Sequence, residues 1–297
     1  MNVAPENLSA AAHLICPEHI SEATAEAVIY DDKNNRHSFE IPDKKVLIRE
    51  DGQYLGTVGK DHPVLQATEV FNIFEPFIES KKLEIEAGMI LKEGTQIVAL
   101  AKLNDSAITP NDTVRNYLMF CTSWNNSLSA TVKFTPVRVV CANALADALT
   151  QKEVGSWTLR NTKNLRQRLI NVQSQISQAL VHAEKTTEMY QYLAKKPATS
   201  QQLINYVTEV LSPEDTGYDE LSTKTQNKIQ RVIELLDEQK GLELVPAIRG
   251  TYWQGYNAVT QYLSHEHGRS FESRLDSNLF GHSAMLNRQA LSMALNA

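Results

Sequence analysis

Basic and aromatic side chains gather between residues 115 and 168, in a chain of 297 residues whose formal net charge is −6. Lysine and arginine neutralise backbone phosphates whatever the base sequence, and aromatic faces can hold unstacked bases. These residue types therefore predict a site that binds one unpaired nucleic-acid strand without reading its sequence. The predicted contact residues are Arg115, Trp124, Lys133, Phe134, Arg138, Arg160, Lys163, Arg166 and Arg168.

The distribution of charge supports this prediction and leaves an alternative open. Residues 128–196 carry 10 basic and 4 acidic side chains, a local charge of +6, whereas the rest of the chain is acidic. A local basic surface matters more for a phosphate partner than the charge of the whole chain. The alternative is that Trp124 and Phe134 belong to a core, while the arginines cap helix ends, pair with acids or form the solvated face of a long helix.

No residue pattern predicts catalysis, a metal or a cofactor. The stretch "GTVGKD" at 56–61 is too short for a phosphate loop, and G-x-S-x-G is absent. In "HEHG", His265 and His267 are two residues apart, which does not suit a metal pair on a helix. Three cysteines without C-x-x-C spacing form neither a zinc site nor a disulfide framework. We expect a protein that is not an enzyme, and buried thiols at Cys121 and Cys141.

Strand patterns dominate the first half of the chain. Hairpins are predicted at 27–42, around "DDKNN", and at 44–59, around Asp51-Gly52. A helix is predicted at 63–80, two strands within 83–103, a loop at 104–112, and two strands within 113–135. The alanine-rich stretch 137–149 predicts a helix, with Pro136 near its first turn.

The second half is predicted to be helical. An apolar stripe from Leu165 to Leu193 indicates a long helix that packs on another helix and ends before Pro197. Further helices are predicted at 199–211, 222–241, 251–267 and 282–297, and the aromatic residues Tyr252, Trp253, Tyr256 and Tyr262 fit a helix–helix core.

The expected fold class is therefore α+β: β-hairpins forming a mixed or antiparallel sheet with two packed helices, followed by an all-helical C-terminal half. The expected domains are an N-terminal arm at 1–27, a sheet domain at 28–155 and a helical domain at 156–297. No apolar run is long enough for a membrane helix, and the N-terminus lacks the features of a secretory signal. We therefore expect a cytoplasmic protein without a membrane partner.

Two stretches resemble a known family. "TPVRVVCANAL" at 135–145 and "TYWQGYNAVTQYLSH" at 251–265 are similar to phage- and plasmid-related proteins of domain-of-unknown-function family 932. The family name carries no chemistry, but the resemblance implies a protein of a mobile element.

A more distant resemblance concerns the order of elements. The helix 64–80, the strands 83–103 and 113–135, and the helix 137–150 resemble the core of single-strand annealing proteins of the Rad-fifty-two and Red-beta type. That resemblance implies a ring-forming homo-oligomer that holds single-stranded DNA in a basic groove and anneals it without ATP in recombination. Two alternatives stay open: an interaction or inhibitor protein of a mobile element, and a metal-dependent nuclease whose carboxylates converge only in the fold.

Overall fold

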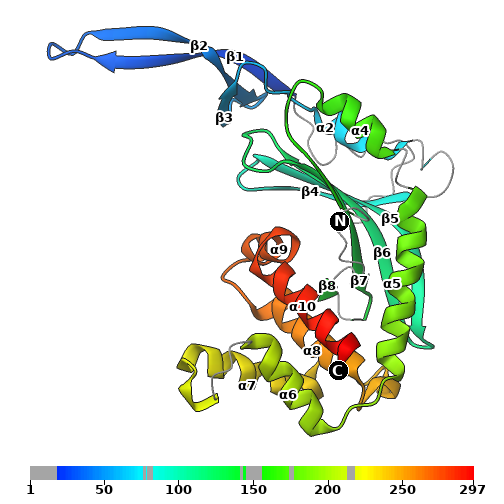
Figure 1. Ribbon diagram of the computed structural model, residues 1–297. Helices are drawn as coiled ribbons and strands as arrows, with labels where there is room; N and C mark the ends of the chain where they lie inside the picture. Colours follow the sequence, from blue (N-terminus) through cyan, green and yellow to red (C-terminus); the bar gives the residue numbers. More distant parts are fainter. Residues whose placement is uncertain are drawn as a thin grey trace. The chain divides into compact units, whose positions relative to one another are not determined.

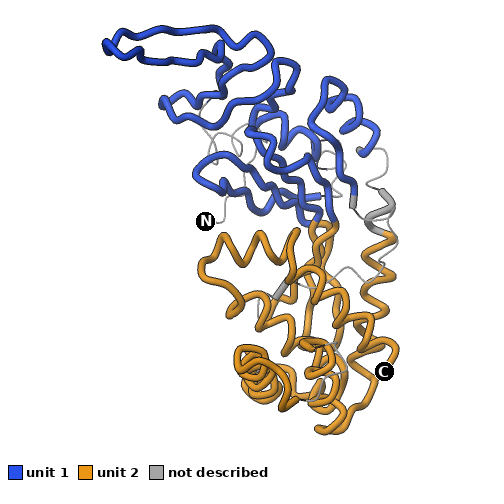
Figure 2. Tube along the Cα trace, turned by 60° about the vertical axis from the view of Figure 1, so that its left-hand side comes forward, with its two compact units in different colours: residues 1–102, 118–133, 156–177 blue, residues 103–117, 134–155, 178–297 orange. Residues whose placement is uncertain are grey.

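The computed structural model describes residues 19–75, 78, 83–140, 143–144, 156–173, 177–212 and 218–297 (Figure 1). Residues 1–18 of the arm predicted at 1–27, which include Cys16, lie outside these residues, as does Cys141. The chain forms two compact units, coloured separately in Figure 2. Unit 1 comprises residues 1–102, 118–133 and 156–177, and unit 2 comprises residues 103–117, 134–155 and 178–297. The chain passes from one unit to the other at residues 102/103, 117/118, 133/134, 155/156 and 177/178, so the units do not follow its linear order.

A three-stranded sheet in unit 1 begins the described chain. Its strands are β1 (Ile20–Tyr30), β2 (Arg36–Arg49) and β3 (Tyr54–Gly59), in the order β1-β2-β3. Both predicted hairpins are confirmed, and they share the continuous strand β2. Gly52 has a φ of 88° in the second turn, which glycine adopts without steric cost. Strand β1 begins at Ile20, so the end of the arm predicted at 1–27 is strand.

The second sheet has six strands in the order β4-β5-β6-β7-β8, and β9 also pairs with β7. The strands are β4 (Glu84–Leu91), β5 (Gln96–Thr109), β6 (Asp112–Ser123), β7 (Ala130–Arg138), β8 (Asn143–Ala144) and β9 (Ser156–Leu159). The α+β class is confirmed, and both sheets are antiparallel in every pairing resolved in register.

Two predictions within this sheet are wrong. The loop predicted at 104–112 is mostly strand, because the side chain of Asn116 donates to Asn104 Oδ1 and Ser106 Oγ and so joins the polar ends of β5 and β6. The helix predicted at 137–149 begins instead as strand: Val137 and Arg138 belong to β7 and pair with Ala144 and Asn143 of β8. Cross-strand pairing outweighs the helix propensity of alanine here. Residues 145–149 lie outside the described residues.

Two short helices lie among the described residues of unit 1. Helix α2 (Ala67–Asn72) buries Val70 and Phe71, as the predicted helix periodicity required. Helix α4 (Leu165–Gln173) buries Leu165, Leu169 and Val172, which lie on one face at steps of four and three residues. Burial of this face leaves the polar side of α4 and the loop before it at the surface.

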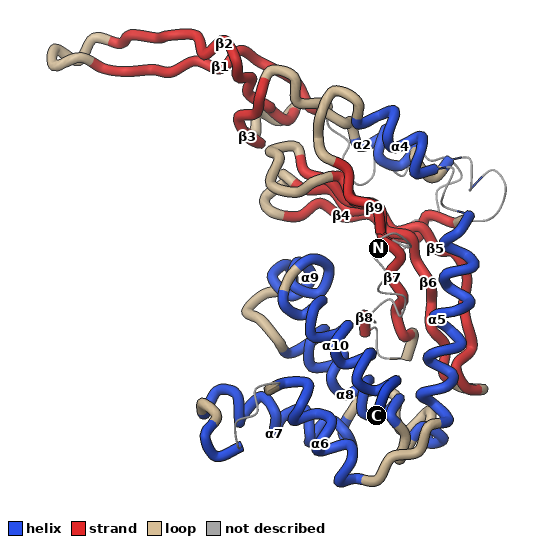
Figure 3. The backbone as a smooth tube through the Cα atoms, viewed as in Figure 1, coloured by secondary structure: helices blue, strands red, loops and turns tan. Residues whose placement is uncertain are grey.

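The helices of unit 2 surround an aromatic core. They are α5 (Ser177–Lys195), α6 (Ser200–Leu211), α7 (Thr223–Glu238), α8 (Tyr252–Gln261), α9 (Phe271–Phe280) and α10 (His282–Asn296), shown as blue tubes in Figure 3. The rings of Tyr190 and Trp253 lie 5.0 Å apart, and those of Trp253 and Tyr256 lie 5.8 Å apart. Tyr252, Trp253 and Tyr256 are buried, which confirms their prediction as core residues.

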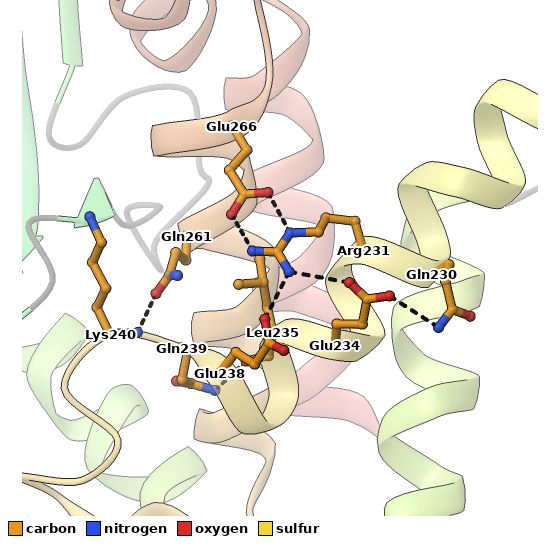
Figure 4. Close-up of polar contacts among 9 residues, drawn as sticks. All are labelled: Gln230, Arg231, Glu234, Leu235, Glu238, Gln239, Lys240, Gln261 and Glu266. Carbon is orange, nitrogen blue, oxygen red and sulfur yellow. Dashed lines mark hydrogen bonds and ion pairs between the residues drawn. The ribbon is translucent and has the colours of Figure 1, made fainter.

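An ion-pair network fixes α7 beside the turn that follows α8 (Figure 4). Arg231 donates to both carboxylate oxygens of Glu266, at 2.7 and 2.9 Å, and to Glu234 and Glu238 on its own helix. These bonds raise the pKa of Arg231, chiefly through Glu266. Glu266 ends a π-helical turn at Tyr262–Glu266, so the network holds an irregular backbone in place.

Candidate nucleic-acid interface

Four of the predicted contact residues lie together on unit 1, in the segment 160–168, which we call the basic loop. It contains Arg160, Lys163, Arg166 and Arg168 and no acidic residue. It runs from the end of β9 into the first turn of α4; three of its cations are exposed, and Arg168 is partly exposed. The structure therefore gathers one part of the predicted site on one surface.

Hydrogen bonds at both ends fix the conformation of the basic loop. Asn161 accepts from the amide of Ala130 at 3.1 Å and donates to the carbonyl of Leu128 at 3.0 Å, which ties the loop to the start of β7. Arg168 donates to Thr162 Oγ1 at 2.9 Å and to the carbonyl of Arg160 at 3.3 Å. Neither acceptor carries a charge, so the positive charge of Arg168 is not neutralised by these bonds.

Arg166 pairs with a carboxylate of helix α2. Its Nε donates to Glu69 Oε1 at 2.6 Å, and its Nη2 donates to Glu69 Oε2 at 3.1 Å and to the carbonyl of Val64 at 3.2 Å. Burial alone would raise the pKa of Glu69, but the bonds from Arg166 and from the amide of Gln66 outweigh it and lower this pKa. Glu69 also raises the pKa of Arg166. Arg166 thus anchors the loop and offers less free charge to a ligand.

Lys163 and Arg160 differ in their surroundings. Lys163 Nζ lies 3.0 Å from Asp61 Oδ2, but both side chains are about 70% exposed, so solvent screens this pair strongly. Arg160 has no ion pair or side-chain hydrogen bond among the described residues. Arg160 and Arg168 are therefore the two cations of the basic loop whose charge no described carboxylate offsets.

Lys133 and Arg115 lie outside the basic loop. Lys133 is half-buried in β7 of unit 1, where its charge moderates the pKa of the Cys121 thiol, which burial raises to about 12. That pKa and the burial of the sulfur confirm Cys121 as an inert core thiol. Arg115 belongs to unit 2 and pairs with Asp105 at 2.9 Å, with both side chains partly exposed.

The two predicted stacking residues are core residues. Trp124 is 1% exposed, and its Nε1 donates to the carbonyl of Leu65 at 2.7 Å. Phe134 is fully buried, and its ring meets that of His182 at 5.2 Å in a T-shaped contact. No face of either ring is open to a base, so the prediction that they stack on nucleic acid is wrong.

Arg138 is also buried, which corrects its prediction as a phosphate contact. Its Nε lies 2.8 and 3.0 Å from the two carboxylate oxygens of Asp112, and both side chains are 0% exposed. Trp253 Nε1 donates to the same carboxylate at 2.7 Å, and the guanidinium lies 5.9 Å from the Trp253 ring. The segments "TPVRVV" and "TYWQGY" are thus joined within unit 2 through Asp112.

The carboxylates that pair with the predicted site residues were missed by sequence reasoning. Asp61 and Glu69 precede their cationic partners in the basic loop by about a hundred residues, and no local pattern links them. The exposed aromatic Tyr54, whose hydroxyl lies 2.9 Å from Thr57 Oγ1, was also missed. Its position, just after the Asp51-Gly52 turn, was the available signal, because loop ends are exposed.

A search of the described residues finds no group of three or more His, Cys, Asp or Glu side chains that could hold a metal ion. Within those same residues, no helix has both the length and the apolar character needed to cross a membrane.

Comparison with known proteins shows the family to which this chain belongs. A family model described as "Domain of unknown function (DUF932)" matches residues 54–288, so the chain belongs to this family. The matched region includes the basic loop, Arg138 and Trp253. No curated protein and no solved structure matches the chain.

Proposed function

We propose that this protein binds single-stranded nucleic acid, in the first place DNA, through the phosphates of the strand and with the basic loop as the contact surface. The observation that carries the proposal is the pair Arg160 and Arg168: Arg160 is exposed, Arg168 is partly exposed, and neither is offset by a described carboxylate. Lys163 and Arg166 lie between them in the sequence and add charge that is partly neutralised.

Phosphate contacts of this kind confer affinity without sequence preference. Trp124 and Phe134 are buried and do not stack on bases, so the binding should be predominantly electrostatic. A backbone held by cations leaves base edges free to pair with a second strand. Annealing is downhill in free energy and needs no ATP. In this proposal the protein promotes annealing and so serves the recombination of a phage or plasmid.

The test is a titration of a fluorescent single-stranded oligonucleotide, followed by anisotropy, at several salt concentrations. We expect the affinity of the wild-type protein to fall steeply with salt. Replacing Arg160 and Arg168 by glutamine removes two phosphate contacts, which should reduce the slope of log K against log salt by about 1.4. Glutamine keeps a donor for Thr162, so the loop should keep its conformation.

Arg269 and Arg288 provide a matched control in unit 2. Both are exposed and neither has a partner among the described residues, so replacing both by glutamine causes the same loss of charge. We expect this control to bind like the wild type. An equal loss of affinity for the oligonucleotide in both double variants would contradict a localised site. Absence of binding by the wild-type protein at low salt would overturn the proposal. Cleavage of the oligonucleotide with Mg²⁺ would support the nuclease alternative instead.

A further inference from the structure

Strands β1 and β2 form a two-stranded ribbon that no other described element of unit 1 covers at its far end (Figure 1). We call residues 20–49 the ribbon. Nearly all side chains from Glu26 to Glu40 are exposed. Five large apolar side chains of the ribbon lie open to solvent: Val28 at 42%, Ile29 at 54%, Tyr30 at 62%, Phe39 at 56% and Ile41 at 38% exposure. A two-stranded hairpin is marginally stable alone in water, so the ribbon needs a partner.

The outer edge of β1 is built for strand pairing. The sheet order β1-β2-β3 places β1 at the edge, and its sequence, ISEATAEAVIY, contains no proline, lysine or arginine. Natural proteins commonly use such residues to block an edge strand, and β1 lacks them. The irregularity between Thr24 and Glu26 lies on the β2 side, where the four residues 41–44 stand opposite Ala25 alone, so β1 itself is continuous.

Two sets of hydrogen bonds show which backbone groups of β1 point outward. The amide and the carbonyl of Ile20 both bond to the side chain of Gln66, so they face away from β2. The amide of Asp31 bonds to the carbonyl of Asn35 across the tip, so the odd positions face β2. Because this direction alternates along an antiparallel strand, the outward groups belong to Glu22, Thr24, Glu26 and Val28.

We propose that two copies of this chain pair along β1, antiparallel and about a two-fold axis at Ala25, which joins two three-stranded sheets into one. This proposal does not depend on nucleic-acid binding. In this register Glu22 lies opposite Val28 of the second copy and Thr24 lies opposite Glu26, so each outward group meets an outward group.

Charge selects this register over its neighbours. Moving the axis to Thr24 would place Glu22 against Glu26, and moving it to Glu26 would place that residue against itself. Like charges directly opposite destabilise a strand pair. With the axis at Ala25, each glutamate faces a neutral side chain, and Glu22 is also paired with Lys45 of its own chain at 2.8 Å. The β1 edge is therefore self-complementary, which favours a second copy over an unrelated strand.

Disulfide crosslinking tests the register. Ala23 and Ala27 are exposed, and in the proposed dimer each faces the other across a non-hydrogen-bonded pair with Cα atoms about 4.5 Å apart, a distance that a disulfide spans. In a background with Cys16 and Cys141 replaced by alanine, the variant Ala23→Cys/Ala27→Cys should form a covalent dimer under mild oxidation. Within one chain the two sites are about 13 Å apart, too far for a disulfide.

The single variants Ala23→Cys and Ala27→Cys are the matched controls. In the proposed register each new cysteine lies about 13 Å from its own copy in the partner, so neither single variant should crosslink appreciably. Equal crosslinking by the single and double variants would overturn the register.

A second variant tests the edge itself. Thr24→Pro removes an outward amide and leaves the ladder with β2 intact, since that amide does not bond to β2. We expect this variant to shift the mass in solution from two chains toward one, whereas Thr24→Val should keep the wild-type mass. A wild-type protein that stays monomeric at high concentration, or a dimer that Thr24→Pro leaves unchanged, would overturn the proposal and leave this edge to a different protein.

Discussion

The guanidinium of Arg138 is buried and pairs with the carboxylate of Asp112. Asp112 accepts from Arg138 and from the indole of Trp253, and all of these groups are buried. Taking charges out of water is costly, and here the cost is offset by two charge-assisted bonds in a low-dielectric environment. Removing Asp112 takes away the carboxylate that this buried guanidinium pairs with.

We therefore expect Asp112→Ala to lower the free energy of unfolding by about 3–5 kcal/mol. The double variant Asp112→Ala/Arg138→Met removes both charges and should recover most of that loss, because buried pairs can be exchanged for apolar residues at little net cost. Urea unfolding of the wild type, both single variants and the double variant measures the coupling. Additive losses in the double variant would contradict this account.

The roles of individual cations could be predicted only in part. A sequence shows that Arg138 and Arg166 are cationic, but Arg138 is neutralised by a residue 26 positions earlier and Arg166 by one 97 positions earlier. Whether an arginine is buried in a pair or open to a phosphate depends on such distant carboxylates. The local composition of the basic loop was sufficient to place its cations at the surface, since four charges in nine residues cannot all be buried.

At the scale of elements, helix α8 is the most enclosed part of unit 2. All its residues from Tyr252 to Gln261 are buried. A glycine in a helix normally weakens it by about 1 kcal/mol relative to alanine. At Gly255, however, an added Cβ would come within 2.9 Å of Leu203 Cδ2 and 3.2 Å of Tyr206 Cδ1 on α6. The glycine is thus what allows α6 and α8 to approach each other.

Gly255→Ala should consequently destabilise the protein despite the better helix propensity of alanine. Overpacking of a core costs about 1–3 kcal/mol, which exceeds the gain in propensity. Thermal unfolding followed by far-ultraviolet circular dichroism would show a lower midpoint. Asn227→Ala, at an exposed position of α7, is a suitable control and should leave the midpoint equal or slightly higher. A stabilised Gly255→Ala variant would show that α6 moves aside freely.

The elements of this fold differ in how far their sequences determine them. Helices with an apolar stripe, such as α4, and hairpins with a glycine turn, such as β2–β3, follow from local periodicity and turn chemistry. Segments 104–109 and 137–138 do not, because they are strands only through their partners: Asn116 bonds Asn104 and Ser106, and Arg138 reaches Asp112. Tertiary pairing decides such segments, and a single sequence does not reveal the partner.

At the scale of the whole molecule, each unit has, among its described residues, a histidine whose pKa is lowered by its surroundings. In unit 1, burial and then the charge of Lys45 lower the pKa of His62. In unit 2, burial and then the charges of Lys228, His282 and Lys224 lower the pKa of His267. The Nδ1 of His267 lies 3.1 Å from Ser283 Oγ, and its ring lies 5.8 Å from that of Tyr262, so the imidazole is confined in a site that disfavours a proton.

These shifts predict how stability depends on pH. An unfolded histidine takes up a proton near pH 6.5, whereas His62 and His267 in the folded protein take one up only at lower pH. Between these values the unfolded state binds more protons, so the free energy of unfolding should fall as the pH drops below about 6.5. Each histidine contributes up to about 1.4 kcal/mol per pH unit within its own window. Unfolding in urea at pH 7.5, 6.5 and 5.5 measures this loss.

The two histidines can be separated by substitution. His62→Gln should remove the part of the loss that belongs to unit 1, His267→Gln the part that belongs to unit 2, and the double variant should be nearly independent of pH down to about pH 5. Below that value Glu69, whose pKa is lowered, begins to contribute, because its stabilisation is lost as it is protonated. A double variant that loses as much stability between pH 7.5 and 5.5 as the wild type would show that other groups control the acid response.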